Sequence, residues 1–220
     1  LDKNLIDVFP DAAFQQVKEA MIQMSDLVLE GLKTSQLYLN DQDSENKDVV
    51  LQLEDIVNRA DTNITSYLLR LAKTGFRQED DAIAYTQALN IVKNYERMSD
   101  LNVNLVKFYE LVYEEEESFT PEGLEDLNTM SNLMLDIATR SQKILIEENE
   151  NDYRRLLKDE EYLDIIEIKY RDRHFERLAD GLDVTKVASS VYVDILGTME
   201  RIGDHSVSAA RNVFNVIKQH

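Results

Sequence analysis

The sequence predicts an all-α protein with six long helices, arranged as two tandem three-helix bundles. Glycine occurs only six times and proline twice in 220 residues, so few positions favour turns. Apolar residues recur every three or four positions through most of the chain, as on one face of an amphipathic helix. Matching segments recur along the sequence, which indicates a duplicated unit. With 43% hydrophobic residues, the chain can bury a core.

The chain opens with a lead-in over residues 1–9, which we expect to pack as an extended arm. Pro10 suits the first turn of a helix, because the N–H that proline lacks has no partner there. The first helix should therefore begin near Pro10 and run to about Leu39. Its apolar stripe has the spacing of one helical face: Phe14, Val17, Met21, Met24, Val28 and Leu32.

Two further helices complete the first repeat, which we place at residues 10–117. Ser44 is a candidate N-cap for the second helix, and Gly75 is placed to end it. The third helix should begin near Gln78 and run to about Glu114. Four acidic residues in a row close this helix at the unfavourable end of its dipole, so we expect them to fray.

The second repeat is predicted over residues 118–220. Thr120 and Pro121 are typical of an N-cap and a first helical residue, so the fourth helix should begin there. The fifth helix should begin near Asp152. Asp183 is a candidate cap for the sixth helix.

Matching segments support the duplication. Residues 24–30 read Met-Ser-Asp-Leu-Val-Leu-Glu, and residues 130–136 read Met-Ser-Asn-Leu-Met-Leu-Asp, 106 positions later. Residues 95–100 read Tyr-Glu-Arg-Met-Ser-Asp, and residues 199–204 read Met-Glu-Arg-Ile-Gly-Asp, 104 positions later. Each repeat therefore ends in a helix with the same charged motif.

The motif places two carboxylates four residues apart, Glu96 with Asp100 and Glu200 with Asp204. On a helix such residues stand one turn apart on a single face, where like charges repel. Both pairs point away from the apolar stripe of their helix. A hard cation between the carboxylates would remove the repulsion. The alternative is an acidic helix face that is only solvated.

The tandem three-helix pattern, together with these Glu-x-x-x-Asp motifs, resembles the PhoU-like domain. More narrowly, residues 1–6 and the segment Tyr-Arg-Asp-Arg-His at residues 170–174 are similar to the cytoplasmic C-terminal domain of bacterial sodium/phosphate cotransporter proteins. The resemblance implies a regulatory helical domain involved in phosphate uptake and its control. It also implies metal ions held by acidic residues of the second and third helix of each repeat. These positions are Glu54, Glu96, Asp100, Glu160, Asp164, Glu200 and Asp204.

The sequence departs from the family pattern at two positions close to these ligands. Asn58 stands where the family commonly has Asp, so the first repeat loses a charged ligand. The family often has Asn eight residues after the Glu of the motif. The first repeat keeps it as Asn104, and the second repeat has Ser208 instead. The ligand set contains only oxygen donors, which suit divalent or trivalent ions such as Mg, Mn or Fe.

Composition and missing motifs exclude several functions. The formal charge of −19 repels nucleic acid and anionic lipid. No apolar run is long enough to span a bilayer, so we expect no membrane insertion of this segment. The chain has no cysteine, no Gly-x-Ser-x-Gly elbow and no phosphate-binding glycine loop, so we expect no enzyme. No Glu-x-x-His motif is present, which counts against a ferritin-type metalloenzyme.

We therefore expect a metal-binding regulatory domain of a sodium-dependent phosphate transporter. Its partner would be the membrane part of the same polypeptide, or another transporter or signalling protein, and it could form a homo-oligomer. The chain starts at Leu1 without a methionine, which fits an excised domain. We expect a cytoplasmic location, as the soluble domain of an inner (plasma) membrane protein. The alternatives are a free-standing PhoU-type regulator and a metal-free helical interaction module.

Overall fold

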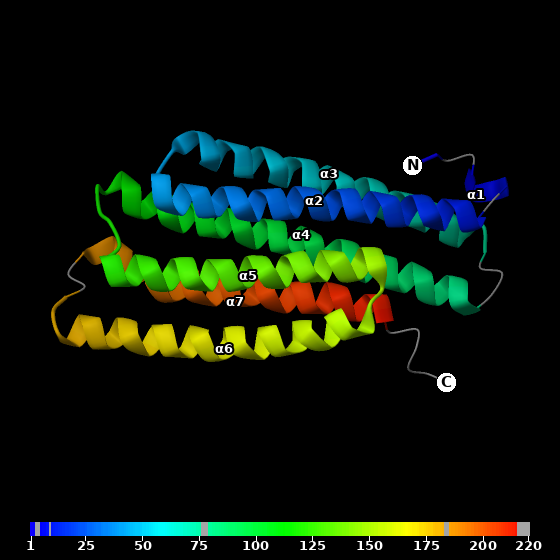
Figure 1. Cartoon of the computed structure of the whole chain (residues 1–220). Coiled ribbons are helices and arrows are strands. Elements are labelled where there is room, and N and C mark those ends of the chain that lie inside the picture. Colours follow the sequence, from blue (N-terminus) through cyan, green and yellow to red (C-terminus); the bar gives the residue numbers. More distant parts are fainter. Residues whose placement is uncertain (3–4, 9, 76–78, 183–184, 215–220) are drawn as a thin grey trace.

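The structure is a computed structural model that describes residues 1–2, 5–8, 10–75, 79–182 and 185–214. Every regular element within these ranges is an α-helix, which confirms the all-α prediction (Figure 1). One short helix precedes six long ones. They are α1 (Leu5–Val8), α2 (Pro10–Asp41), α3 (Ser44–Lys73), α4 (Glu79–Glu114), α5 (Pro121–Glu147), α6 (Glu150–Ala179) and α7 (Lys186–Phe214).

The lead-in was wrongly predicted as an extended arm. Its described part forms the single helical turn α1, and Ile6 joins the core with only 3% of its surface exposed. The hydroxyl of Tyr67 on α3 donates to the carbonyl of Asp2 at 2.9 Å. An extended arm would need partners along its whole backbone, whereas a helical turn pairs part of it internally.

Helix boundaries follow local capping chemistry. Asp43, not Ser44, is the N-cap of α3, because its carboxylate accepts the backbone N–H of Glu45 at 2.9 Å. Gly75 follows the end of α3 with φ +85°, a left-handed conformation that suits glycine. The predicted start of the next helix at Gln78 lies outside the described residues.

The start of the second repeat is as predicted. Thr120 has an extended backbone, and its hydroxyl accepts the N–H of Gly123 at 3.1 Å, while Pro121 is the first residue of α5. Helix α6 begins earlier than expected, because Asn149 caps it by accepting the N–H of Asn151 at 2.9 Å.

The N-terminus of α7 is capped by a residue from far away in the sequence. One carboxylate oxygen of Glu117 accepts the N–H groups of Val187 and Ala188, each at 2.9 Å. The negative charge also compensates the positive end of the helix dipole. The acidic run after α4 therefore ties the connection between repeats to α7. The cap predicted at Asp183 lies outside the described residues.

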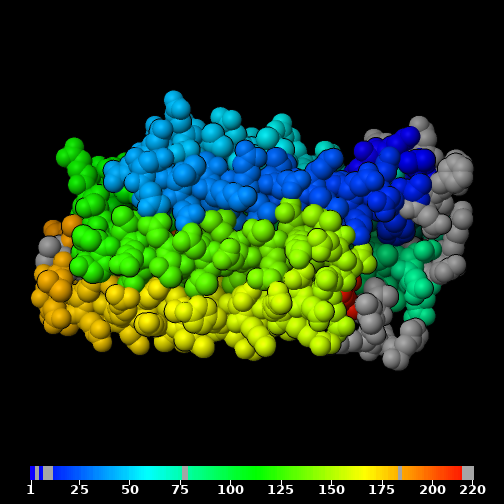
Figure 2. All heavy atoms as spheres, viewed as in Figure 1, coloured from blue at the N-terminus to red at the C-terminus, as the bar shows by residue number. Residues whose placement is uncertain are grey.

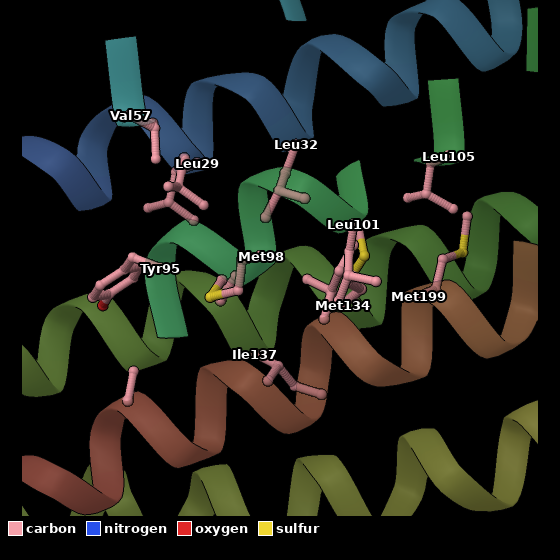
Figure 3. Close-up of a cluster of buried hydrophobic side chains, with 14 of the residues drawn as sticks. Leu29, Leu32, Val57, Tyr95, Met98, Leu101, Leu105, Met134, Ile137 and Met199 are labelled. Carbon is pink, nitrogen blue, oxygen red and sulfur yellow. The ribbon is translucent and has the colours of Figure 1, made fainter. Parts of the chain in front are cut away.

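The two repeats share one core. The most extensive helix contact is between α4 and α7, the third helices of the two repeats, and α2 also packs against α5. Helix α3 packs chiefly on α2 and α4, and α6 chiefly on α5 and α7, so these two helices form opposite edges of the bundle (Figure 1). Figure 3 shows Leu32 and Met98 of the first repeat in one cluster with Met134 and Met199 of the second.

A buried ion cluster fixes α6 to α5. Both oxygens of the buried Asp126 carboxylate accept hydrogen bonds, one from Arg173 at 2.6 Å and one from Arg177 at 3.0 Å. The guanidinium of Arg177 also lies 5.3 Å from the centre of the Tyr192 ring on α7. This cluster joins the three helices of the second repeat at one end.

We expect Asp126→Ala to lower the free energy of unfolding by about 3 kcal/mol, because it leaves a buried guanidinium without its anion. Asp159→Ala is the matched control. It removes a more exposed carboxylate, 2.9 Å from Arg140, and should cost less than about 1 kcal/mol. Urea unfolding followed by circular dichroism measures both losses. Equal losses would contradict a structural role for the buried cluster.

Candidate metal site

The carboxylates predicted for the second repeat meet between α6 and α7. Glu160 and Asp164 come from α6, and Asp204 comes from α7. Oxygens of these three residues lie within 4.8 Å of one another. Two oxygens bound to one ion are separated by at most twice the metal–oxygen distance, about 4–5 Å. The three oxygens are therefore close enough for one hard cation to contact all of them.

The orientation of α7 explains why its acids face α6. Met199 and Ile202 are fully buried in the shared core. Glu200 and Asp204 lie on another side of the helix and are directed toward the outer helix instead. Glu200 is partly buried there, whereas Asp204 is exposed.

Burial, and then the charges of neighbouring acids, raise the pKa values of Glu160, Asp164 and Glu200 in this cluster. Burial raises the pKa of Glu200 from its ordinary value of 4.5 to about 7, and the charges of Asp204 and Asp164 add to the effect. The pKa of Glu160 is also raised, first by burial and then by Asp164. The buried Oδ1 of Asp164 has no hydrogen-bond partner. The cluster therefore favours a neutralising proton or cation.

A hollow of about 280 Å³ adjoins the cluster. It is lined by Asp164, Glu167, Ile168, Arg171, Gly197 and Glu200. The sequence analysis missed Glu167, which is buried and paired with Arg171. Its spacing was a usable signal, because Glu167 follows Glu160 by seven residues and therefore lies on the same helix face.

The first repeat does not bring its predicted ligands together in the same way. The side-chain amide of Asn58 donates to Glu54. On α4, the guanidinium of Arg97 lies 3.7 Å from Glu96 and 3.3 Å from Asp100. Among the described residues, the cluster of the second repeat is the only one with three ligand atoms within 4.8 Å.

A lysine supplies positive charge in the first repeat. The ammonium of Lys93 lies 2.6 Å from a carboxylate oxygen of Asp61, the counterpart of Glu167. At the matching position of the second repeat stands Gly197, 104 residues later. A Cβ atom there would meet nothing within 4 Å. The first repeat thus carries an ammonium at a position where the second has open space. In the second repeat the counterpart acid, Glu167, pairs with Arg171 from its own helix instead.

The histidine of the second motif links the two repeats. Nδ1 of His205 lies 2.9 Å from the amide oxygen of Asn94 on α4. The side chain is partly buried, and burial lowers its pKa. His205 is therefore not an ordinary surface histidine. His174 is buried in the core, and its ring stacks on Tyr192 with the centroids 4.4 Å apart.

Four of the five arginines of α6 pair with acids, so they do not form a free anion-binding group: Arg154, Arg171, Arg173 and Arg177. Arg154 lies 3.0 Å from Glu150, four residues earlier on the same helix. Arg171 pairs with Glu167 in the same manner.

The fold and this cluster define a class of protein: a duplicated three-helix unit with carboxylates gathered between the second and third helices of a repeat. The PhoU domain family matches residues 21–108 and 127–213, one match in each repeat. The chain therefore belongs to the PhoU domain family.

Two curated proteins are similar to this chain. The chain is 27% identical over 128 residues to "Phosphate-specific transport system accessory protein PhoU homolog 1" of Thermotoga maritima, which covers 58% of this chain and 54% of that protein. It is 23% identical over 217 residues to "Putative inorganic phosphate export protein YjbB" of Salmonella typhimurium, covering 97% of this chain and 39% of that protein. The chain thus spans about half or less of the length of these curated relatives.

The solved structure of PhoU from Pseudomonas aeruginosa has the same fold, with a TM-score of 0.86 and 18% identity. The likeness covers 96% of this chain and 99% of that one. It confirms the prediction of six helices in two tandem three-helix bundles. Within the described ranges, no helix has the length and apolar character needed to cross a bilayer.

For the metal-free protein, we expect Glu200 to make stability fall as pH rises from about 4.5 to about 7. In this window the folded state binds more protons than the unfolded state, because the pKa of Glu200 is raised on folding. Glu200→Gln should remove this part of the dependence of the free energy of unfolding on pH. Above pH 7 it should add about 1 kcal/mol of stability, once solvent screening is allowed for.

Urea unfolding across this pH range, with a chelator present, measures the effect. Glu125→Gln, on the exposed side of α5, is the control and should leave this pH dependence unchanged. If the free energy of unfolding depends on pH in the same way in Glu200→Gln as in the unmodified protein, Glu200 is not the carboxylate whose pKa is raised on folding.

Proposed function

We propose that this chain is a PhoU-type regulator of phosphate transport that acts on the cytoplasmic side of a membrane by contact with a transport or signalling protein. The family match over both repeats carries the proposal. The Thermotoga relative, which is named as an accessory protein of a phosphate-specific transport system, supports it. The fold match to almost the whole length of a solved PhoU favours a regulator that is a separate protein.

The match to the Salmonella relative favours a second arrangement. That alignment covers 97% of this chain but only 39% of a protein named for phosphate export. A domain of this type can therefore form part of a longer polypeptide. In this arrangement the chain would be the regulatory domain of a transporter, and the sodium dependence implied by its resemblance to cotransporters would belong to the membrane part.

Deletion of the coding region for this domain should leave phosphate uptake high when external phosphate is abundant, because the regulator that restrains the transporter is lost. Uptake of radioactive phosphate by cells measures this. A blot of membrane and soluble fractions with an antibody to the domain separates the two arrangements, since a fused domain stays with the membrane. Unchanged uptake and unchanged response to phosphate in the deletion strain would refute the proposed function.

We also propose that the second repeat binds a hard metal ion, Mg, Mn or Fe, through Glu160, Asp164, Glu200 and Asp204. Three observations support this: the approach of the carboxylate oxygens, the raised pKa values, and the unpaired buried oxygen of Asp164. A cation would replace the proton that the cluster otherwise favours.

For the first repeat, Glu54, Glu96 and Asp100 were the ligands implied by the resemblance. Here Arg97 approaches Glu96 and Asp100, and the ammonium of Lys93 pairs with a nearby acid. Both cations reduce the need for a metal. We therefore propose that the first repeat binds a metal ion more weakly than the second.

Mn²⁺ should bind the purified protein and raise its free energy of unfolding by about 2.7 kcal/mol at one hundred times the dissociation constant. Glu200→Ala with Asp204→Ala should abolish the binding. Gly197→Lys should do so as well, because it places an ammonium where Lys93 stands in the first repeat. Calorimetric titration and elemental analysis measure binding, and thermal unfolding measures stabilisation.

Gly197→Ala is the matched control, since its methyl group has open space and brings no charge. It should keep the response to Mn²⁺. If neither a chelator nor divalent ions change the melting temperature of the unmodified protein, the metal-free interaction module is favoured. Redox turnover under aerobic iron loading would instead point to an enzyme of ferritin type.

A further inference from the structure

The outer face of α6 carries a line of large apolar side chains that the bundle leaves uncovered. Helix α6 packs chiefly on α5 and α7, and it runs along one edge of the face seen in Figure 2. We call this line the outer ridge. Its members are Ile165, Ile168 and Phe175, with exposed fractions of 61%, 57% and 52%.

The outer ridge is not required by the fold. The first repeat has Arg59 and Thr62 at the positions that match Ile165 and Ile168, 106 residues earlier. The equivalent helix α3 therefore keeps charged and polar residues at the middle of its outer face. Contiguous exposed apolar surface of this kind marks a site of interaction with another molecule.

The spacing along the outer ridge suits another helix. Ile165, Ile168, Asp172 and Phe175 are spaced three, four and three residues apart, as on the contact face of a coiled coil. From Ile165 to Phe175 the ridge is about 15 Å long at 1.5 Å per residue. A partner helix of about two heptads would cover it.

The charges beside the outer ridge indicate that the partner helix carries basic residues. Three exposed acids on this face, Glu161, Asp172 and Glu176, have no ion pair in the described part of the chain. Two exposed lysines, Lys158 and Lys169, have none there either. Asp172 lies within the apolar pattern, between Ile168 and Phe175. A basic residue in the contact face of the partner would pair with it and set the register.

We propose that the outer ridge binds an amphipathic helix of another protein, with an apolar contact face, basic flanks and one Lys or Arg opposite Asp172. A second copy of this chain fits less well, because each copy carries a net charge of −19 and antiparallel pairing would bring two Asp172 carboxylates together. An anionic membrane is repelled for the same reason. This proposal rests on none of the observations that support the metal site or phosphate regulation.

Two synthetic helical peptides of about two heptads test the proposal. Both carry the same leucine contact face. One has Lys at the flanks and at a central contact position, and the other has Glu at the same places. Fluorescence anisotropy should show the Lys peptide binding at least about tenfold more tightly, and more weakly as salt rises. Ile168→Glu should weaken this binding at least about tenfold, and Asp172→Lys should reverse the preference between the peptides.

Two variants control for general effects. Leu69→Glu changes the residue that matches Phe175 on α3, where 48% of the side chain is exposed, and should leave binding unchanged. Glu125→Lys makes the same charge change as Asp172→Lys away from the outer ridge, and should also preserve the preference. Equal effects of Glu125→Lys and Asp172→Lys would overturn the proposal, as would equal binding of both peptides. So would a stable dimer of the parent chain that Ile168→Glu dissociates, because the occupant would then be a second copy.

Discussion

The packing of α4 against α7 is the constraint on which the rest of the structure depends. Each of these helices carries a motif with two acids one turn apart, and each buries its apolar side in the core that the repeats share. Met98 and Met199 both belong to this shared core, with no exposed surface. Because these apolar sides are buried in the core, the rotation of each helix about its axis is fixed. The acids of each motif can then only face the outer helix of their own repeat or solvent. A cluster of carboxylates at the edge of the bundle is therefore a consequence of how the two repeats join.

Such a cluster costs free energy unless its charge is neutralised, and the two repeats differ in how this happens. In the first repeat, Lys93 and Arg97 bring positive charge to the acids, and Asn58 replaces one carboxylate by an amide. In the second repeat the position of Lys93 is taken by Gly197, and a hollow remains beside the acids. A duplicated unit has thus kept its helices while its electrostatics diverged. This difference is the strongest reason to assign a metal ion to the second repeat.

The helices and the pairing of acids could be predicted from the sequence because both depend on local periodicity. A spacing of three and four residues identifies the buried face, and a spacing of four places two acids on one side of a helix. Local capping was predictable at Thr120, where the cap and the proline lie together in the sequence. Capping of α7 by Glu117 was not, because that residue is 70 positions away from the N–H groups it accepts. The role of Lys93 was missed for a similar reason: it is 32 residues from Asp61 in the sequence, and the packing of α4 on α3 brings the two side chains together.

The two proposals for the second repeat meet at Ile168, which belongs to the outer ridge and also lines the hollow beside the carboxylates. A basic helix bound on the ridge would lie close to the cluster and would be attracted by its negative charge. A cation bound in the cluster reduces that charge, so it should weaken the attraction for the helix. By linkage, a bound basic helix must weaken the affinity for the cation by the same factor. If both proposals hold, the ion and the partner compete through electrostatics without sharing a single ligand atom, and occupancy of the cluster can control what this regulator contacts.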